Sequence, residues 1–280
     1  VEVVVPDPLD RNAMSFVGIT RRATPVWIDR RAERADVKIS IGYIVPHLYV
    51  GYSGGAKIVL PGISAVETIS QNHALVLSQY AKPGVLHNNP MREDIEEAAK
   101  LAGLDFIVNV VPNSMNETVN VVAGDPQKAH RKGVNMSNKV FGVKIEKRAD
   151  ICIVSPGDRS EMFARRAINP SLARADLATK PGGTIILVAS CVKGWAPEDE
   201  IDNEFCPNPE MMKLGYEDLC RLIVRRAKRS TFQMMRNVAE IFALRRIFKG
   251  KNVVLISDLS DNEAREFGFS PASDVVDALS

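Results

Sequence analysis

Three side chains that can carry out acid–base or covalent chemistry lie close together in the first third of this 280-residue sequence. His47 and His73 each supply an imidazole, which binds transition metals and changes its charge near neutral pH. Lys57 lies between them, and its amine can form a covalent bond with a carbonyl or acyl group. These residue types predict a site that holds a cofactor or a small carbonyl compound.

Glycines surround the lysine and predict a loop that approaches an anion or a nucleotide. Gly51, Gly54 and Gly55 can adopt positive φ and bring backbone N–H groups close to a ligand. The loop is not a Walker A motif, because the glycine spacing differs and no Ser or Thr follows Lys57.

Local patterns predict the elements that position these residues. The β-branched run over residues 37–45 predicts a buried strand that ends before Pro46, so His47 follows a strand end. Ser64 is expected to cap a helix that carries His73 on its apolar face. In α/β proteins, ligands bind beyond the carboxyl ends of parallel strands.

This spacing resembles the nickel-pincer-nucleotide-dependent lactate racemase family. The resemblance is carried by the string PHLYVGYSGGAKIVLPGI, which starts at Pro46, and by the ETI and NH that follow it. It continues through FIVNVV, AGD, GGTIILVAS and ISDL, and so covers nearly the whole chain. It implies a racemase or epimerase that acts at C2 of a 2-hydroxy acid by reversible hydride transfer to a cofactor.

The resemblance implies a role for each residue. Lys57 would be joined through a thioamide to pyridinium-3-thioamide-5-thiocarboxylate mononucleotide, the nickel pincer nucleotide, which separate cofactor biosynthesis proteins make. His73 would bind its Ni, and His47 would be one of two acid/base groups, a task that suits neutral imidazole. Four residues would contact the cofactor, with the glycines leaving room for its ring: Ser53, Gly54, Gly55 and Asn109.

Two features depart from the lactate racemase pattern. The upstream D-H-[TS]-R-P and T-G-x-H-R-P motifs, which in the family bind the cofactor phosphate and supply the second catalytic histidine, do not occur here. We therefore expect this chain alone to be inactive unless another chain carries them. The family's substrate-binding Tyr-Gln and lysine correspond to Arg166, Ala167 and Pro170. Arg165 or Arg166 could instead hold a carboxylate, or simply lie on an exposed helix face, and we expect a substrate other than lactate.

Two alternative functions use the same residues. In the first, the chain is a catalytically incomplete or split relative that binds a nucleotide or acts as one subunit with a partner chain. In the second, Lys57 forms a Schiff base with a carbonyl substrate or pyridoxal phosphate. Absorbance and intact mass distinguish an aldimine from an adduct that contains sulfur and nickel.

The wider sequence predicts an α/β protein with two lobes and a site in the cleft between them. Residues 1–140 would form the cofactor-attachment lobe and residues 141–280 the substrate lobe, with a polar boundary at 135–148. Strands and helices alternate in the second lobe, which predicts a doubly wound, mostly parallel sheet. The first residues, VEVVV, are expected to form a strand.

Composition excludes several classes of function. A net charge of +2 gives no support for a nucleic-acid partner, and the basic run over 221–229 predicts a solvated helix. No apolar run reaches 18 residues, so we expect no membrane span. The four cysteines show no C-x-x-C spacing and indicate a reducing, cytoplasmic location without a zinc site. His87 is expected in a turn, and His130 in a packing or capping role.

Overall fold

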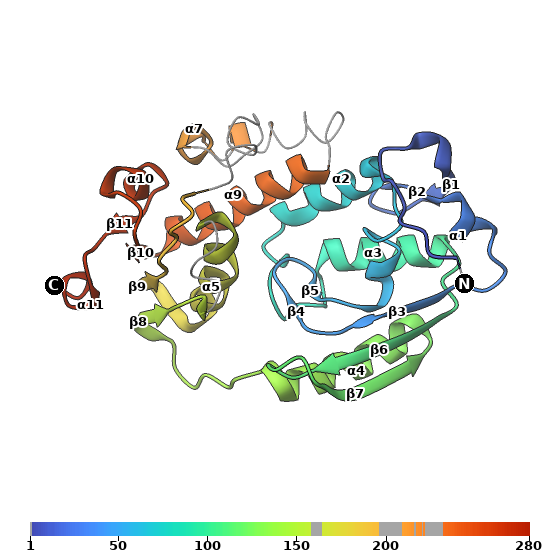
Figure 1. Cartoon of the computed structure of the whole chain (residues 1–280), viewed down its shortest axis with the longest axis horizontal. Helices are drawn as coiled ribbons and strands as arrows, with labels where there is room; N and C mark the ends of the chain where they lie inside the picture. The colour runs from blue at the N-terminus through green and yellow to red at the C-terminus, as the bar shows by residue number, and fades with distance from the viewer. Residues whose placement is uncertain (1, 158–163, 196–208, 216, 220, 222–231) are drawn as a thin grey trace. The chain divides into compact units, whose positions relative to one another are not determined.

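The computed structural model describes residues 2–157, 164–195, 209–215, 217–219, 221 and 232–280 (Figure 1). The chain divides into two compact units. Unit 1 comprises Val1–Val143 and Val224–Met235, and unit 2 comprises Lys144–Ile223 and Arg236–Ser280. The predicted position of the site between two lobes stays a prediction.

Unit 1 contains a two-stranded hairpin, a three-stranded sheet and the helices around them (Figure 1). Its strands are β1 (Met14–Ile19), β2 (Pro25–Asp29), β3 (Ile39–Tyr43), β4 (Pro46–His47), β5 (Gly51–Tyr52), β6 (Phe106–Pro112) and β7 (Thr118–Gly124). Its α-helices are α1 (Arg30–Arg34), α2 (Val66–Ala74), α3 (Pro90–Leu101) and α4 (Pro126–Phe141). Short 3-10 helices are η1 (Arg11–Ala13), η2 (Gly55–Ile58) and η3 (Leu75–Leu77).

The three-stranded sheet determines where the site segment lies. Its order is β3-β6-β7, with β3 parallel to β6 and β6 antiparallel to β7. Parallel neighbours need a long crossover connection. The crossover from β3 to β6 contains β4, β5, η2, α2 and α3, and therefore all three residues with predicted chemistry.

The two longer helices of unit 1 begin with the same N-terminal capping arrangement. Asn89 caps α3 by accepting from the N–H of Arg92, and Asp125 caps α4 by accepting from the N–H groups of Gln127 and Lys128. In each helix proline follows the cap, where its missing N–H costs nothing. The turn predicted at His87 is confirmed.

Two local predictions in unit 1 are wrong. Residues 2–5 are not in a strand. Ser64 does not cap α2, because its hydroxyl donates to Val59 O at 2.6 Å and Ala65 occupies the cap position. Helix α4 continues to Phe141, and the chain passes from unit 1 to unit 2 between Val143 and Lys144, inside the range 135–148 expected for the boundary.

Unit 2 contains a four-stranded sheet with order β11-β10-β9-β8 in which all neighbours are parallel. Its strands are β8 (Ala149–Val154), β9 (Thr179–Val188), β10 (Asn252–Ile256) and β11 (Ser270–Pro271). Its helices are α5 (Ala164–Ala178), α7 (Pro209–Lys213), α10 (Asp261–Glu266) and α11 (Val275–Ala278), and α9 (Phe232–Gly250) contributes most of its length.

This sheet confirms the predicted α/β class and the parallel sheet of the second lobe. Among the described strands the order does not reverse, so the doubly wound arrangement is not seen there. The hydrophobic core of unit 2 contains Leu172 of α5, Ile185 of β9 and Leu255 of β10, together with other apolar side chains. The basic run over 221–229 lies almost entirely outside the described residues. None of the described helices is long and apolar enough to span a membrane.

Candidate functional site

Four basic side chains gather around the glycine loop of unit 1. The pKa of His47 is well below its ordinary value, first because the imidazole is buried, and then because the charges of Lys57, His73 and Arg92 act on it. These groups come from β4, η2, α2 and α3, so the crossover brings the three predicted residues into one electrostatic environment. The N–H of Tyr49 lies 3.3 Å from His47 Nδ1 and orients the ring. The lowered pKa favours a neutral imidazole at pH 7, and because Nδ1 accepts from this N–H, Nε2 holds the proton of the neutral ring.

Lys57 is prepared for covalent chemistry. Burial, followed by the charge of Arg92, lowers the pKa of its amine from 10.5 to about 8. Both causes disfavour the ammonium form, because one removes hydration and the other adds like charge. About a tenth of Lys57 is therefore the neutral, nucleophilic amine at pH 7.

This leads to a prediction about Lys57 in the chain without cofactor. Its rate of acetylation by acetic anhydride, followed peptide by peptide with mass spectrometry, should rise with a midpoint near pH 8. The acetylation profile of Lys128, which is exposed on α4, serves as the internal reference. A Lys57 midpoint above 10 would contradict the assigned environment.

His73 has its tautomer fixed by the helix that carries it. Its Nδ1 lies 2.8 Å from Ile69 O, one turn earlier in α2. Since a carbonyl can only accept, Nδ1 holds the proton and Nε2 carries the lone pair that a metal needs. The neighbouring Asn72 donates to Met91 O and to Asp94 Oδ2, which ties α2 to α3 and fixes the direction of this face.

Ser53 and Asn109 hold the loop itself. The hydroxyl of Ser53 donates to Tyr43 O at 2.8 Å and accepts from the N–H of Val45. Asn109 has no exposed surface, and it accepts from the N–H of Gly55 at 2.7 Å while donating to a backbone carbonyl. Both side chains are committed to protein partners, so this structure gives them a positioning role, and their predicted contacts with a cofactor stay predictions.

The reason predicted for Gly54 and Gly55 is wrong. A Cβ on Gly54 would lie 2.8 Å from Asn109 Oδ1 and from Tyr43 O, and a Cβ on Gly55 would lie 2.8 Å from His130 Cδ2. Both glycines also have positive φ, +72° and +60°. Protein atoms fill the space that a side chain would need, so these glycines let the loop pack tightly and do not themselves make room for a ring.

Gly54 can be tested against a glycine with a similar φ and open surroundings. Gly182 has φ of +75° with no atom within 4 Å of a Cβ. Gly182→Ala is expected to cost about 1 kcal/mol for the positive φ alone. Gly54→Ala is expected to cost about 2 kcal/mol or more, because its ψ of −171° gives a conformation that few residues other than glycine adopt, and because a collision is added. Urea denaturation measures both, and equal losses would show that the packing around Gly54 contributes nothing.

A buried network behind the loop was not predicted from sequence. Arg92 is fully buried, with its Nε 3.2 Å from Glu96 Oε1 and its Nη2 3.1 Å from Nδ1 of His130. Nε2 of His130 lies 2.8 Å from Ser53 O and also contacts Nη2 of Arg92, so the imidazole connects the guanidinium to the loop. Burial and the charge of Arg92 lower the pKa of His130 to about 3.

This network confirms the packing role predicted for His130. The signal for Arg92 was present in the sequence, because it shares a face of α3 with Ile95 and Ala99, and a charge on an apolar face needs a buried partner.

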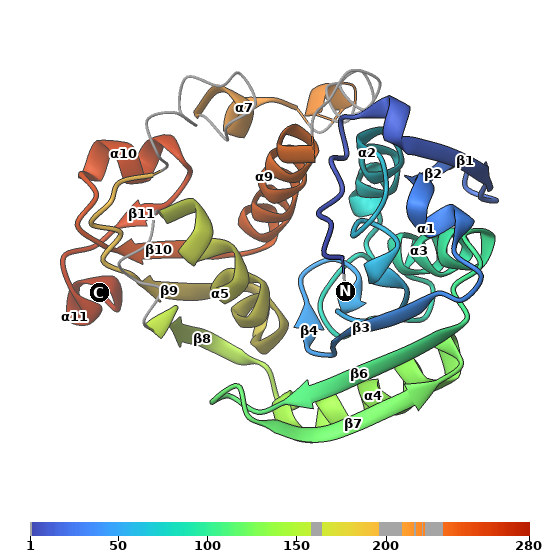
Figure 2. The same ribbon diagram turned by 45° about the vertical axis from the view of Figure 1, so that its right-hand side comes forward.

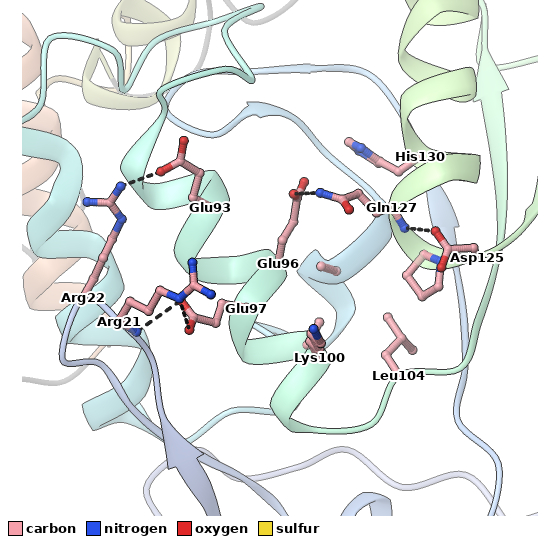
Figure 3. Close-up of a pocket in the computed structure, with 13 residues that line it drawn as sticks. Arg21, Arg22, Glu93, Glu96, Glu97, Lys100, Leu104, Asp125, Gln127 and His130 are labelled. Carbon is pink, nitrogen blue, oxygen red and sulfur yellow. Dashed lines mark hydrogen bonds and ion pairs between the residues drawn. The ribbon is translucent and has the colours of Figure 1, made fainter.

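A pocket of about 860 Å³ opens on the far side of this network (Figure 3). Figure 3 shows Glu96 hydrogen-bonded to Gln127, with His130 facing the same space from α4. Its charged side chains neutralise one another, as in the pair of Arg22 with Glu93. His47, Lys57 and His73 do not line it, so it is separate from the candidate site.

Two further predictions concern metal and substrate. Among the described residues, no group of three or more His, Cys, Asp or Glu side chains could hold a metal, so a metal at His73 would need donors that the described residues do not supply. Arg165 and Arg166 lie in α5 of unit 2, and their side chains fall outside the described residues.

Comparison with known proteins connects this site to one family. The family described as lactate racemase N-terminal domain matches residues 1–84. Lactate racemase of Thermoanaerobacterium thermosaccharolyticum is 32% identical over 99% of this chain and 64% of its own length. Lactate racemase of Lactiplantibacillus plantarum is 33% identical over 70% of this chain and 47% of its own length.

Solved structures agree with the sequence matches. The lactate racemase apoprotein from T. thermosaccharolyticum superposes with a TM-score of 0.82 over 99% of this chain and 64% of that chain, at 31% identity. A protein from Thermotoga maritima shares the fold at 18% identity, with a TM-score of 0.60 over 96% of this chain and 71% of its own. This chain spans less than two thirds of the length of the lactate racemases that it matches. Across nearly all its residues, this chain is similar in sequence and in fold to lactate racemase.

Proposed function

We propose that this chain forms the cofactor-binding part of a racemase or epimerase that acts at C2 of a 2-hydroxy acid. In this proposal Lys57 attaches a nickel pincer nucleotide, His73 binds its nickel, and His47 moves a proton at the substrate hydroxyl. The observation that carries the proposal is the gathering of these three groups around one loop, with their charges acting on His47.

The residues present fit such a cofactor. A pincer nucleotide brings its own sulfur and carbon donors, so one imidazole completes its nickel coordination, which agrees with a site where the described residues offer no larger ligand cluster. The Nε2 lone pair of His73 and the partly neutral amine of Lys57 are the forms that ligation and thioamide formation require. When bound, the cofactor would supply a hydride acceptor.

The chain's own residues would control the proton and the geometry. His47 would move the hydroxyl proton of the substrate as one of two acid/base groups: its Nε2–H can donate to the hydroxyl oxygen, and accepting a proton there would require the other tautomer, which gives up the bond from Tyr49 to Nδ1. Ser53 and Asn109 would keep the loop in place from behind. A lowered pKa keeps His47 a base at neutral pH, so its basic function should persist in mildly acidic solution.

We propose a substrate other than lactate, because Pro170 stands where we align the lysine that contacts lactate. Arg165 or Arg166 would bind a carboxylate in its place. Comparing racemisation rates for lactate with those for larger and more acidic 2-hydroxy acids tests this choice, and a clear preference for lactate would contradict it.

The cofactor is tested by nickel analysis together with peptide mass. The chain is purified after co-expression with the cofactor biosynthesis proteins, and we expect about one nickel per chain and a sulfur-containing adduct on the peptide that holds Lys57. An adduct without sulfur that borohydride reduces would instead support a Schiff base. If the purified chain carried no adduct on this peptide and no nickel, the proposal would be overturned.

A further inference from the structure

One face of the β3-β6-β7 sheet is apolar, and none of the described helices of unit 1 covers it. Ile39, Ile41 and Tyr43 alternate along β3 and are all more than half exposed, and Val121 on β7 is 58% exposed. Strand register places these side chains in rows across the sheet, because Ile41 pairs with Val108 and Tyr43 with Val110, which in turn pairs with Val121. The surface formed by these rows is called the open face below. Its members are Ile39, Ile41, Tyr43, Phe106, Val108, Val110, Val119, Val121 and Ala123.

The opposite face of the same strands is covered. Ile107, Val111 and Val122 alternate with the open-face residues and are almost completely buried. Val134 of α4 packs in the same core, and α4 runs along β6 and β7 (Figure 2). A Cβ on Gly133 of α4 would lie 3.0 Å from Val122, so the helix and the sheet are in close contact.

The sequence of these strands is typical of a sheet covered on both faces. None of the three strands contains a charged residue. A sheet with one solvated face normally alternates apolar with polar side chains, whereas sheets with parallel strands are covered by helices on both sides and are apolar throughout. The parallel pair β3 and β6 has the second pattern, although only one face is covered.

We propose that the open face binds the polypeptide segment equivalent to the part of lactate racemase that this chain does not span. The alignment leaves the rest of the T. thermosaccharolyticum enzyme unmatched, since it covers 64% of that protein. Such a segment would place a helix with an apolar stripe over the rows of Ile41 and Val121, completing the layer that α4 forms on the other side. This inference rests on the sheet and on the family, and does not depend on the proposed activity.

The test measures complex formation and uses neither activity nor nickel. The untagged chain is co-expressed with a tagged fragment of the T. thermosaccharolyticum enzyme that lies outside the alignment, and the fragment is captured. The wild-type chain should co-purify in a one-to-one complex, and Ile41→Lys should reduce its yield roughly tenfold or more, because an ammonium would be buried without a partner. Ile19→Lys is the matched control, since Ile19 is 61% exposed on β1, in a different sheet.

Two controls and two contradicting outcomes complete the test. Thermal unfolding of the isolated variants checks that both are folded, which is expected for substitutions at exposed positions. Light scattering of the chain alone reports self-association, and a wild-type dimer that Ile41→Lys converts to monomer would make a second copy the occupant. Absence of co-purification, or equal capture of the wild-type chain and Ile41→Lys, would overturn the proposal directly.

Discussion

Lys57→Arg is expected to abolish cofactor attachment and, in any preparation where the wild type turns over, to lower racemisation roughly 1000-fold or more. Arginine keeps the positive charge and much of the length of the side chain, but its guanidinium stays protonated and is not a nucleophile at neutral pH. The environment that lowers the pKa of Lys57 to about 8 cannot make an arginine reactive. The variant should therefore carry no mass adduct and only background nickel.

Lys128→Arg is the matched control, because Lys128 is exposed on α4 and does not take part in the site. It should load nickel and turn over like the wild type. Circular dichroism and urea denaturation establish that Lys57→Arg is folded. If Lys57→Arg still bound nickel and carried an adduct of the wild-type mass on another peptide, Lys57 would not be the attachment point.

The positions of His47, Lys57 and His73 were predictable because the information is local. A proline ends one strand, a glycine pair forms a turn, and a histidine at helical spacing follows, so all three chemical groups lie in a single crossover between parallel strands. Parallel strands in unit 2 were likewise predictable from alternating strand and helix patterns.

The partners behind the loop were not predictable, because they come from distant parts of the chain. Asn109 reaches Gly55 across 54 positions, and His130 reaches Ser53 across 77. Spacing along the sequence carries no signal for contacts of this length. The miss at Ser64 has a local cause: its hydroxyl donates to Val59 O, five positions earlier in the turn, and Ala65 takes the cap position of α2.

Acid should destabilise the chain through His130, and His130→Gln should remove much of that sensitivity. In the folded protein burial and Arg92 hold the pKa of His130 at about 3, while the unfolded chain has the ordinary value of 6.5. Below pH 6.5 the unfolded state therefore binds a proton that the folded state excludes, and the free energy of unfolding falls as the pH falls. The loss from this residue should reach about 2 kcal/mol at pH 5 and about 3 kcal/mol at pH 4.

Glutamine suits the comparison because it can keep both hydrogen bonds, donating to Ser53 O and accepting from Arg92, without titrating. Urea denaturation at pH 7, 5 and 4 should give a smaller acid loss for His130→Gln than for the wild type. Part of the loss should remain, because His47 also has a lowered pKa and acts in the same direction. His87→Gln, which removes an exposed imidazole, is the matched control. If His130→Gln and His87→Gln behave alike, His130 is not the buried neutral acceptor that holds Arg92 against the loop.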